Sequence, residues 1–214
     1  MKAKNVSYTQ AYYLCAVNGK GELKTDAIHG ALFAGAVLEL IESGYIEYAG
    51  DKKEKVVVSK VFDESILHLK PLYDFISSQR KTLERASITD FVFNSKSRCE
   101  LIATIGSSLL ALGYATELSS QGLLKNKARY VPKVDTEKLI VGNIRTEILK
   151  DEKMADETIS LMALLIHSHA VYDYFSEIES DVLEKRLVEV QDSDAFAITR
   201  EIFDSIMAAF VWEV

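Results

Sequence analysis

An apolar helix that stops at a glycine and leads into a β-hairpin is the feature that most constrains this fold. Residues 31–41 read Ala-Leu-Phe-Ala-Gly-Ala-Val-Leu-Glu-Leu-Ile. Apolar side chains on nearly every face predict a helix that is buried on all sides. Gly44 suits the left-handed position that ends a helix. Residues 45–48 and 56–59 then switch to strand-like sequence on either side of a turn, which predicts two antiparallel strands.

The same pattern occurs a second time further along the chain. Residues 109–117, Leu-Leu-Ala-Leu-Gly-Tyr-Ala-Thr-Glu, resemble residues 40–47, Leu-Ile-Glu-Ser-Gly-Tyr-Ile-Glu. In both segments an apolar helix ends at Gly-Tyr and a short strand follows. A turn over 119–122 and a returning strand over 123–131 complete the second copy. The chain is therefore predicted to contain two helix–hairpin units, related by a weak internal repeat.

The remaining apolar patterns predict helices. We expect Thr25 or Asp26 to cap the central helix, because either offers a side-chain oxygen to the free N–H groups of the first turn. Further helices are expected over 7–17, 66–77, 83–93, 97–112, 135–149, 159–166, 181–190 and 195–212. The predicted fold is mainly α: a single globular domain over residues 1–214, built around a central buried helix, with two small antiparallel β-hairpins at its periphery.

Composition places the chain among soluble globular proteins. Of its 214 residues, 48% are hydrophobic and 27% are charged, which are ordinary values for that class. No run reaches the roughly 18 consecutive apolar residues of a membrane-spanning helix, and the N-terminus lacks the apolar core of a signal peptide. Cys15 and Cys99 lie in apolar helical contexts and are expected to be free thiols. We expect a cytoplasmic protein that is not secreted.

Charge is distributed unevenly between the two parts of the chain. Residues 1–133 hold 18 Lys and Arg against 14 Asp and Glu, whereas residues 134–214 hold 7 against 18. The acidic total, −7, argues against nucleic acid as the main partner. The N-terminal part is compatible with a face for an anionic surface. The alternative is that the C-terminal helices merely carry solvated acidic faces.

The histidines and cysteines show no metal-binding pattern. His167 and His169 are two residues apart, and such positions do not share a face of a helix. No Cys-x-x-Cys occurs in the sequence, so the spacings typical of zinc sites are missing. His29 and His68 stand alone and are expected to be structural. We expect no metal and no cofactor.

No catalytic motif is recognisable either. The sequence contains no Gly-x-Gly-x-x-Gly, no P-loop and no Gly-x-Ser-x-Gly. Ser107 and Ser108 lie in a predicted apolar helix, and no general base stands at a spacing that would indicate nucleophilic catalysis. Glu39 stands between leucines of the central helix, and a buried carboxylate needs a partner. We expect a structural pairing with a backbone donor or an arginine, no catalytic residue, and no enzyme activity.

A helix followed by a β-hairpin is also typical of winged-helix DNA-binding domains. Their recognition helix needs Arg, Asn or Gln on its exposed face. The central helix offers Ala, Phe, Gly and Glu there. The lysines of residues 52–55 could contact phosphate as a wing, but a lysine-rich hairpin tip is also ordinary protection of a sheet edge. Nucleic acid is therefore not the expected partner.

Taken in order, five segments resemble the Golgi phosphoprotein 3 family, peripheral membrane proteins whose bacterial relatives share the same domain. The similarity covers nearly the whole chain. The segments are residues 30–46, Arg129-Tyr-Val-Pro132, residues 143–149 with their Asn-Ile-Arg and Ile-Leu, residues 156–170, and residues 206–210. The resemblance implies a mostly helical domain around a buried helix, with hairpins that mediate self-association.

The resemblance also implies a site. Eukaryotic members bind phosphatidylinositol 4-phosphate through an aromatic tip residue and arginines on one basic face. Lys24 aligns with the tip residue, and Cys99 and Ile102 align at or near the arginines. The nearest cations to this face are Lys24, Lys96 and Arg98, which could hold an anionic headgroup through charge-assisted hydrogen bonds.

Two functions follow from these expectations. The first is a peripheral membrane adaptor on the inner face of a membrane, which binds anionic lipid headgroups of the phosphatidylinositol 4-phosphate type and turns its acidic face toward cytosolic protein partners. The alternative is an interaction module that has lost the lipid site and forms homo-oligomers through the hairpin of residues 45–60.

Overall fold

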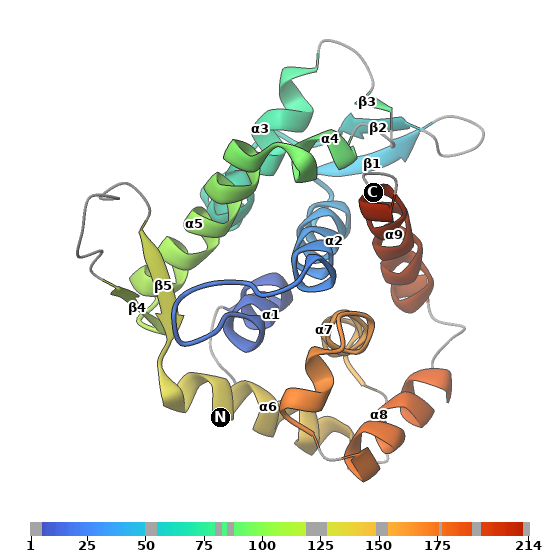
Figure 1. Ribbon diagram of the computed structural model, residues 1–214. Coiled ribbons are helices and arrows are strands. Elements are labelled where there is room, and N and C mark those ends of the chain that lie inside the picture. Colours follow the sequence, from blue (N-terminus) through green and yellow to red (C-terminus); the bar gives the residue numbers. More distant parts are fainter. Residues whose placement is uncertain are drawn as a thin grey trace.

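The computed structural model describes residues 6–49, 55–79, 83–84, 88–118, 128–148, 154–175, 177–189 and 194–211. The fold is mainly α, with small antiparallel sheets at its edge, as predicted (Figure 1). Among the helices of these ranges, none combines the length and the apolar content needed to cross a membrane.

The described residues form helices, 3₁₀ turns and short strands. The helices are α1 (Tyr8–Ala16), α2 (Asp26–Glu42), α3 (Lys70–Ser78), α4 (Ile88–Phe93), α5 (Ser95–Ala111), α6 (Val134–Ile148), α7 (Asp156–His167), α8 (Glu177–Glu189) and α9 (Asp194–Val211), with 3₁₀ turns η1 (Glu64–Leu69) and η3 (Ala170–Asp173). The strands are β1 (Ile46–Ala49), β2 (Lys55–Val58), β3 (Leu83–Glu84), β4 (Ala115–Leu118) and β5 (Arg129–Pro132).

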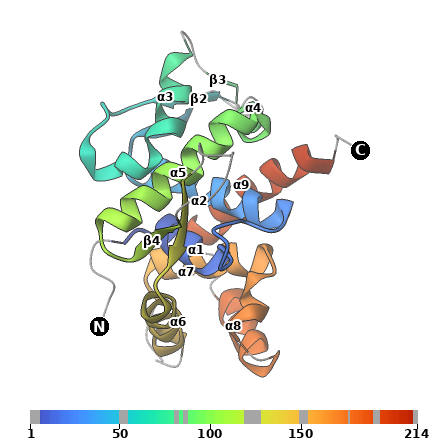
Figure 2. The same ribbon diagram turned by 60° about the vertical axis from the view of Figure 1, so that its left-hand side comes forward.

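Helix α2 is the centre of the fold, as predicted. Helices α1, α7 and α9 pack against it, and α5 runs along the outside of α1 from α4 to β4 (Figures 1 and 2). Thr25 caps the start of α2 by accepting a hydrogen bond from the backbone N–H of Ile28. A Cβ atom added at Gly35 would lie 2.9 Å from Leu164 of α7 and 3.4 Å from Thr9 of α1. The missing side chain therefore lets three helices approach closely.

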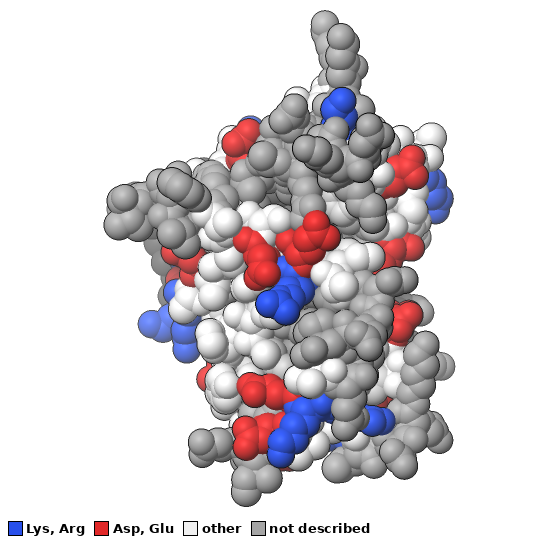
Figure 3. All heavy atoms as spheres, turned by 90° about the vertical axis from the view of Figure 1, so that its right-hand side faces the viewer, with Lys and Arg blue, Asp and Glu red and all other residues white. Residues whose placement is uncertain are grey.

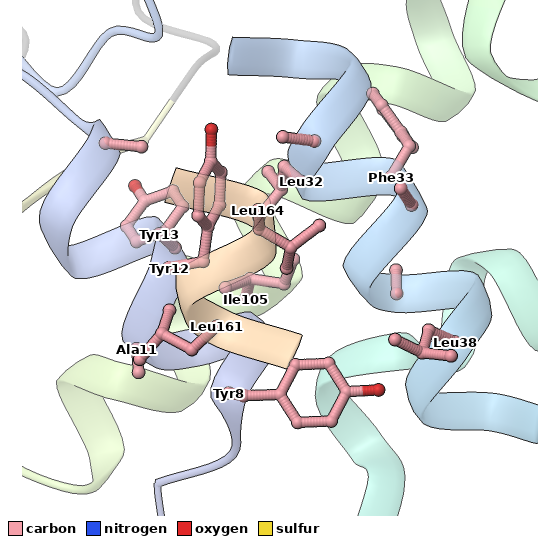
Figure 4. Close-up of a cluster of buried hydrophobic side chains, with 14 of the residues drawn as sticks. Tyr8, Ala11, Tyr12, Tyr13, Leu32, Phe33, Leu38, Ile105, Leu161 and Leu164 are labelled. Atoms are coloured by element: carbon pink, nitrogen blue, oxygen red, sulfur yellow. The ribbon is translucent and has the colours of Figure 1, made fainter. Parts of the chain in front are cut away.

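The core between these helices is aliphatic and aromatic. Tyr12 and Tyr13 from α1 meet Leu32 from α2 and Leu164 from α7, and all four side chains are almost fully buried (Figure 4). Burial of a large apolar side chain stabilises a fold by about 1.5–3 kcal/mol. This cluster therefore explains why a helix that is apolar on all sides can be accommodated.

The two predicted helix–hairpin units are built from the same backbone hydrogen bonds. In each unit the glycine after the helix has a positive φ, +71° at Gly44 and +80° at Gly113. The glycine and the following tyrosine then donate to carbonyls of the last helical turn. These bonds are Gly44 to Ile41, Tyr45 to Leu40, Gly113 to Leu110 and Tyr114 to Leu109, each 2.9 Å long. The internal repeat is thus a repeat of structure.

The sheets are small, and one strand was not predicted. Strand β1 pairs antiparallel with β2, and β4 with β5. Strand β3 adds to the free edge of β2, where Leu83 lies opposite Val56. The prediction of one helix over 83–93 is therefore wrong, because Leu83 and Glu84 pair with β2 and α4 begins only at Ile88. Such pairing depends on a tertiary neighbour that local periodicity does not contain.

Other boundaries differ in smaller ways. The helix predicted over 66–77 begins as the 3₁₀ turn η1, and α3 starts at Lys70 with Pro71 in its first turn, where proline is well tolerated. The turn η3 follows His169, whose φ is 60°, and was not predicted. Residues 50–52 of the first predicted turn, the whole second turn and residues 123–127 of its returning strand lie outside the described residues.

The packing of β5 on α5 gives a direct test of the fold. A Cβ atom at Gly106 would lie 2.3 Å from the ring of Tyr130. We expect Gly106→Ala to lower the free energy of unfolding by about 1–3 kcal/mol, because the tyrosine must move. At Gly142 of α6 nothing lies within 4 Å of an added Cβ, so Gly142→Ala should stabilise by up to about 1 kcal/mol. Urea unfolding measures both, and equal effects would contradict the packing.

Candidate functional site

The cations predicted from the sequence lie where two helices begin. Lys24 is exposed and directly precedes Thr25, the N-cap of α2. Lys96 and Arg98 follow Asn94, the N-cap of α5. The start of a helix carries free N–H groups and a partial positive charge, so anions bind there readily. Cations at such a position add to the attraction for an anion.

The charge of Arg98, near the start of α5, also acts on His29, near the start of α2. His29, in the first turns of α2, has its Nδ1 3.0 Å from the carbonyl oxygen of Thr25. Burial lowers the pKa of His29, and the Arg98 charge lowers it further, against the opposing effects of the Thr25 bond and Asp26. His29 is therefore mostly neutral at neutral pH, and Arg98, which is half-buried, supplies the permanent charge.

Lys96 does not belong to the same surface as Arg98. The two residues are two positions apart on α5, which places them on nearly opposite sides of a helix with 3.6 residues per turn. The Lys96 ammonium lies 3.9 Å from the Glu100 carboxylate, and its side chain is 84% exposed. The structure thus separates the predicted set into Arg98 with the start of α2, and Lys96 with Glu100.

Glu39 and His68 form a buried pair that sequence analysis missed. The His68 Nε2 lies 2.7 Å from Glu39 Oε1, and the two side chains are 6% and 9% exposed. The expectation that Glu39 meets an arginine or a backbone donor is wrong, because its partner is a histidine, whereas the expected structural role of His68 agrees with this pair. Helix α2 and the turn η1 supply one residue each, and only the fold brings them together. Glu39 Oε2 is buried without a hydrogen-bond partner in the described part of the chain.

A serine joins this pair, but the arrangement differs from a catalytic triad. Ser7 Oγ lies 3.2 Å from the same nitrogen, His68 Nε2. In a Ser-His-Asp triad the hydroxyl and the carboxylate contact opposite ring nitrogens, so that the histidine can relay a proton. Ser7 Oγ also accepts a hydrogen bond from the Gln10 N–H as part of the capping box of α1. The cluster therefore ties α1, α2 and η1 together.

The other candidate histidine and cysteine residues have surroundings that indicate structural roles. His167 stacks on Phe203 of α9 with ring centres 4.9 Å apart. Cys15 and Cys99 are free thiols, as predicted, and burial raises the pKa of Cys15 to about 12, so Cys15 stays protonated. In the portion of the chain that the structure describes, no group of three or more His, Cys, Asp or Glu side chains could hold a metal ion.

The charge of the C-terminal helices is mixed on the face that carries α8 and α9. Acidic side chains form separate groups on this face, and several of these groups lie beside basic ones (Figure 3). On α9, the Nε atom of Arg200 lies 3.7 Å from Oδ2 of Asp204. This face fits the interpretation of solvated helix surfaces better than that of one continuous acidic surface.

No protein-family model matches this sequence, and a search of curated proteins finds no match. The resemblance to the Golgi phosphoprotein 3 family therefore rests on its residues alone.

The buried pair predicts a strong asymmetry between single and double substitutions. His68→Leu removes the partner of a buried carboxylate and should lower the free energy of unfolding by about 3–5 kcal/mol. Adding Glu39→Met removes the carboxylate as well, so the double variant should recover most of that loss. Urea unfolding of the wild type, both single variants and the double variant measures the coupling. A double variant as unstable as the sum of the single variants would contradict it.

Proposed function

We propose that this protein is a peripheral membrane adaptor that binds anionic lipid headgroups, of the phosphatidylinositol 4-phosphate type, at the starts of α2 and α5. The observation that supports this most is that the charge of Arg98 acts on His29, because the start of α5 is then near enough to that of α2 for one anion to be attracted to both. Lys24 adds an exposed charge at the same end of α2.

The chemistry of the region suits a phosphate. The guanidinium of Arg98 can donate two parallel hydrogen bonds to phosphate oxygens, which an ammonium cannot do. Thr25 and Asn94 already accept from N–H groups at these two helix starts, so the backbone donates to the same anion only through the N–H groups that the caps leave. Asp26 in the first turn of α2 opposes an anion, so we expect moderate affinity. Lys24 stands where an aromatic wedge would insert, so docking depends on charge and should weaken with salt.

Co-sedimentation with vesicles tests the proposal. The protein should pellet with anionic vesicles, including ones that contain phosphatidylinositol 4-phosphate, and not with neutral ones. Binding should fade at high salt. Each basic residue near an anionic bilayer contributes roughly 1 kcal/mol, so Arg98→Ala and Lys24→Ala should each weaken binding about fivefold. Lys96→Ala should weaken it less, because Glu100 already lies beside this lysine.

Lys185→Ala is the matched control, because it removes one exposed charge from α8. It should leave vesicle binding unchanged. A protein that stays in the supernatant at every salt concentration and with every lipid would exclude the lipid-binding proposal.

One observation favours the alternative, a self-associating interaction module. In the first sheet the strand order is β1-β2-β3, so β1 is an edge strand. An edge strand presents unpaired backbone groups with which a second copy can pair. This alternative would gain support if the protein ignored all vesicles while its mass in solution rose with concentration.

His29 adds a pH dependence to the lipid proposal. Its pKa lies below the ordinary value near 6.5, so acidification from pH 7.5 to 5.5 raises the fraction of His29 that is charged. A headgroup phosphate stabilises the charged form, and binding should therefore strengthen as the pH falls. Phosphatidylglycerol vesicles suit the measurement because their charge stays constant over this range. His29→Gln should remove most of the added dependence, and an unchanged profile in this variant would exclude His29 as the cause.

A further inference from the structure

The loop that leads into α2 is fastened to strand β5 (Figure 1). In the turn of residues 18–22, Oδ1 of Asn18 accepts hydrogen bonds from two backbone N–H groups of the same turn, at 2.8 and 3.1 Å. Gly21 has a φ of +71°, which glycine adopts without strain. A Cβ atom added to Gly21 would lie 2.8 Å from Cβ of Arg129 and 3.3 Å from the backbone of the next residue of β5. The turn therefore packs directly on the strand.

An ion pair adds to this contact. Nη1 of Arg129 donates a hydrogen bond of 2.6 Å to Oε1 of Glu22. The two side chains are 51% and 43% exposed, and surface ion pairs of this kind contribute little to stability. The close packing at Gly21 already holds the turn on β5. The pair therefore matters more for the charge around the turn than for the fold.

Glu22 stands beside the proposed headgroup site. It precedes Lys24 by two residues, so the α-carbons of the two are at most about 7 Å apart. This separation is shorter than the Debye length at physiological salt, about 8 Å, so charges there still interact. Leu23 packs on the core between them, whereas Lys24 is exposed and Glu22 partly so. A bare carboxylate at Glu22 would repel an anion that Lys24 attracts.

The local sequence alone is unfavourable for an anion. Lys24 lies between Glu22, two residues before it, and Asp26, two residues after it. Two carboxylates against one ammonium give this segment a negative balance. Strand β5 changes the balance, because Arg129 brings a cation to Glu22 from a distant part of the chain.

We infer that Arg129 is a positioning residue for the headgroup site, which it serves from β5 without contact to the lipid. It holds the Glu22 carboxylate against β5 and cancels its charge. Lys24 and Arg98 then attract the anion with Asp26 as the opposing charge. The inference rests on the headgroup site proposed above and adds to it a residue that acts through Glu22.

A double-variant cycle in vesicle co-sedimentation, with vesicles that contain phosphatidylinositol 4-phosphate, tests the inference. Arg129→Ala should weaken binding about threefold, the effect of one bare charge at about 7 Å in water. Glu22→Gln removes the carboxylate itself, so the double variant Arg129→Ala/Glu22→Gln should bind like the wild type. Arg129→Lys keeps a cation beside Glu22 and should also bind normally.

Lys185→Ala, which should bind normally, changes the net charge of the protein by the same amount as Arg129→Ala, so it separates a local effect from a global one. Thermal unfolding checks that each variant is folded. A double variant as weak as Arg129→Ala alone would overturn the inference, because removal of the Glu22 charge would then not matter. Unchanged binding in Arg129→Ala, while Lys24→Ala still weakens it, would overturn the inference and leave the headgroup site in place. Absence of binding by the wild type would overturn both.

Discussion

The burial of α2 is the constraint on which the rest of this structure depends. A helix with apolar side chains on every face is stable in water only when other elements cover all of them. Helices α1, α7 and α9 do so, and Gly35 lets α1 and α7 approach within van der Waals contact. Because α2 is held on all sides, both of its ends have fixed positions. The start presents Lys24 and His29, and the end presents the glutamates of its last turns.

One polar residue inside this apolar helix adds a second constraint. Glu39 is buried, and a buried carboxylate without a partner destabilises a fold by several kcal/mol. His68 supplies that partner from η1, and Ser7 completes the contact from α1. The pair therefore fixes how η1 and the start of α1 sit against α2. It adds specificity of arrangement where apolar packing alone would allow small shifts.

Local chemistry made part of this fold predictable from the sequence. The helix ends at Gly-Tyr were predictable because glycine tolerates a positive φ without strain. Gly44 and Gly113 both adopt a positive φ. Strand β3 and the partner of Glu39 could not be predicted from the sequence, because each depends on a segment that only the fold brings near. The division between Lys96 and Arg98 was present in the sequence, since residues two apart on a helix face opposite ways. Both were expected at the site because they are among the cations nearest in sequence to the positions that the resemblance implies.

The proposed headgroup site depends on the dipole of α2. At the positive start of the helix stand Lys24, His29 and, from α5, Arg98, while Glu39 and Glu42 stand at its negative end. The charges of Lys24, Arg98 and the glutamates oppose the dipole, whereas Asp26 in the first turn follows the usual preference. Natural sequences depart from such local rules chiefly at functional sites. An anion bound at the start of α2 would relieve the conflict there. The arrangement that costs stability in the free protein is then the one that favours binding.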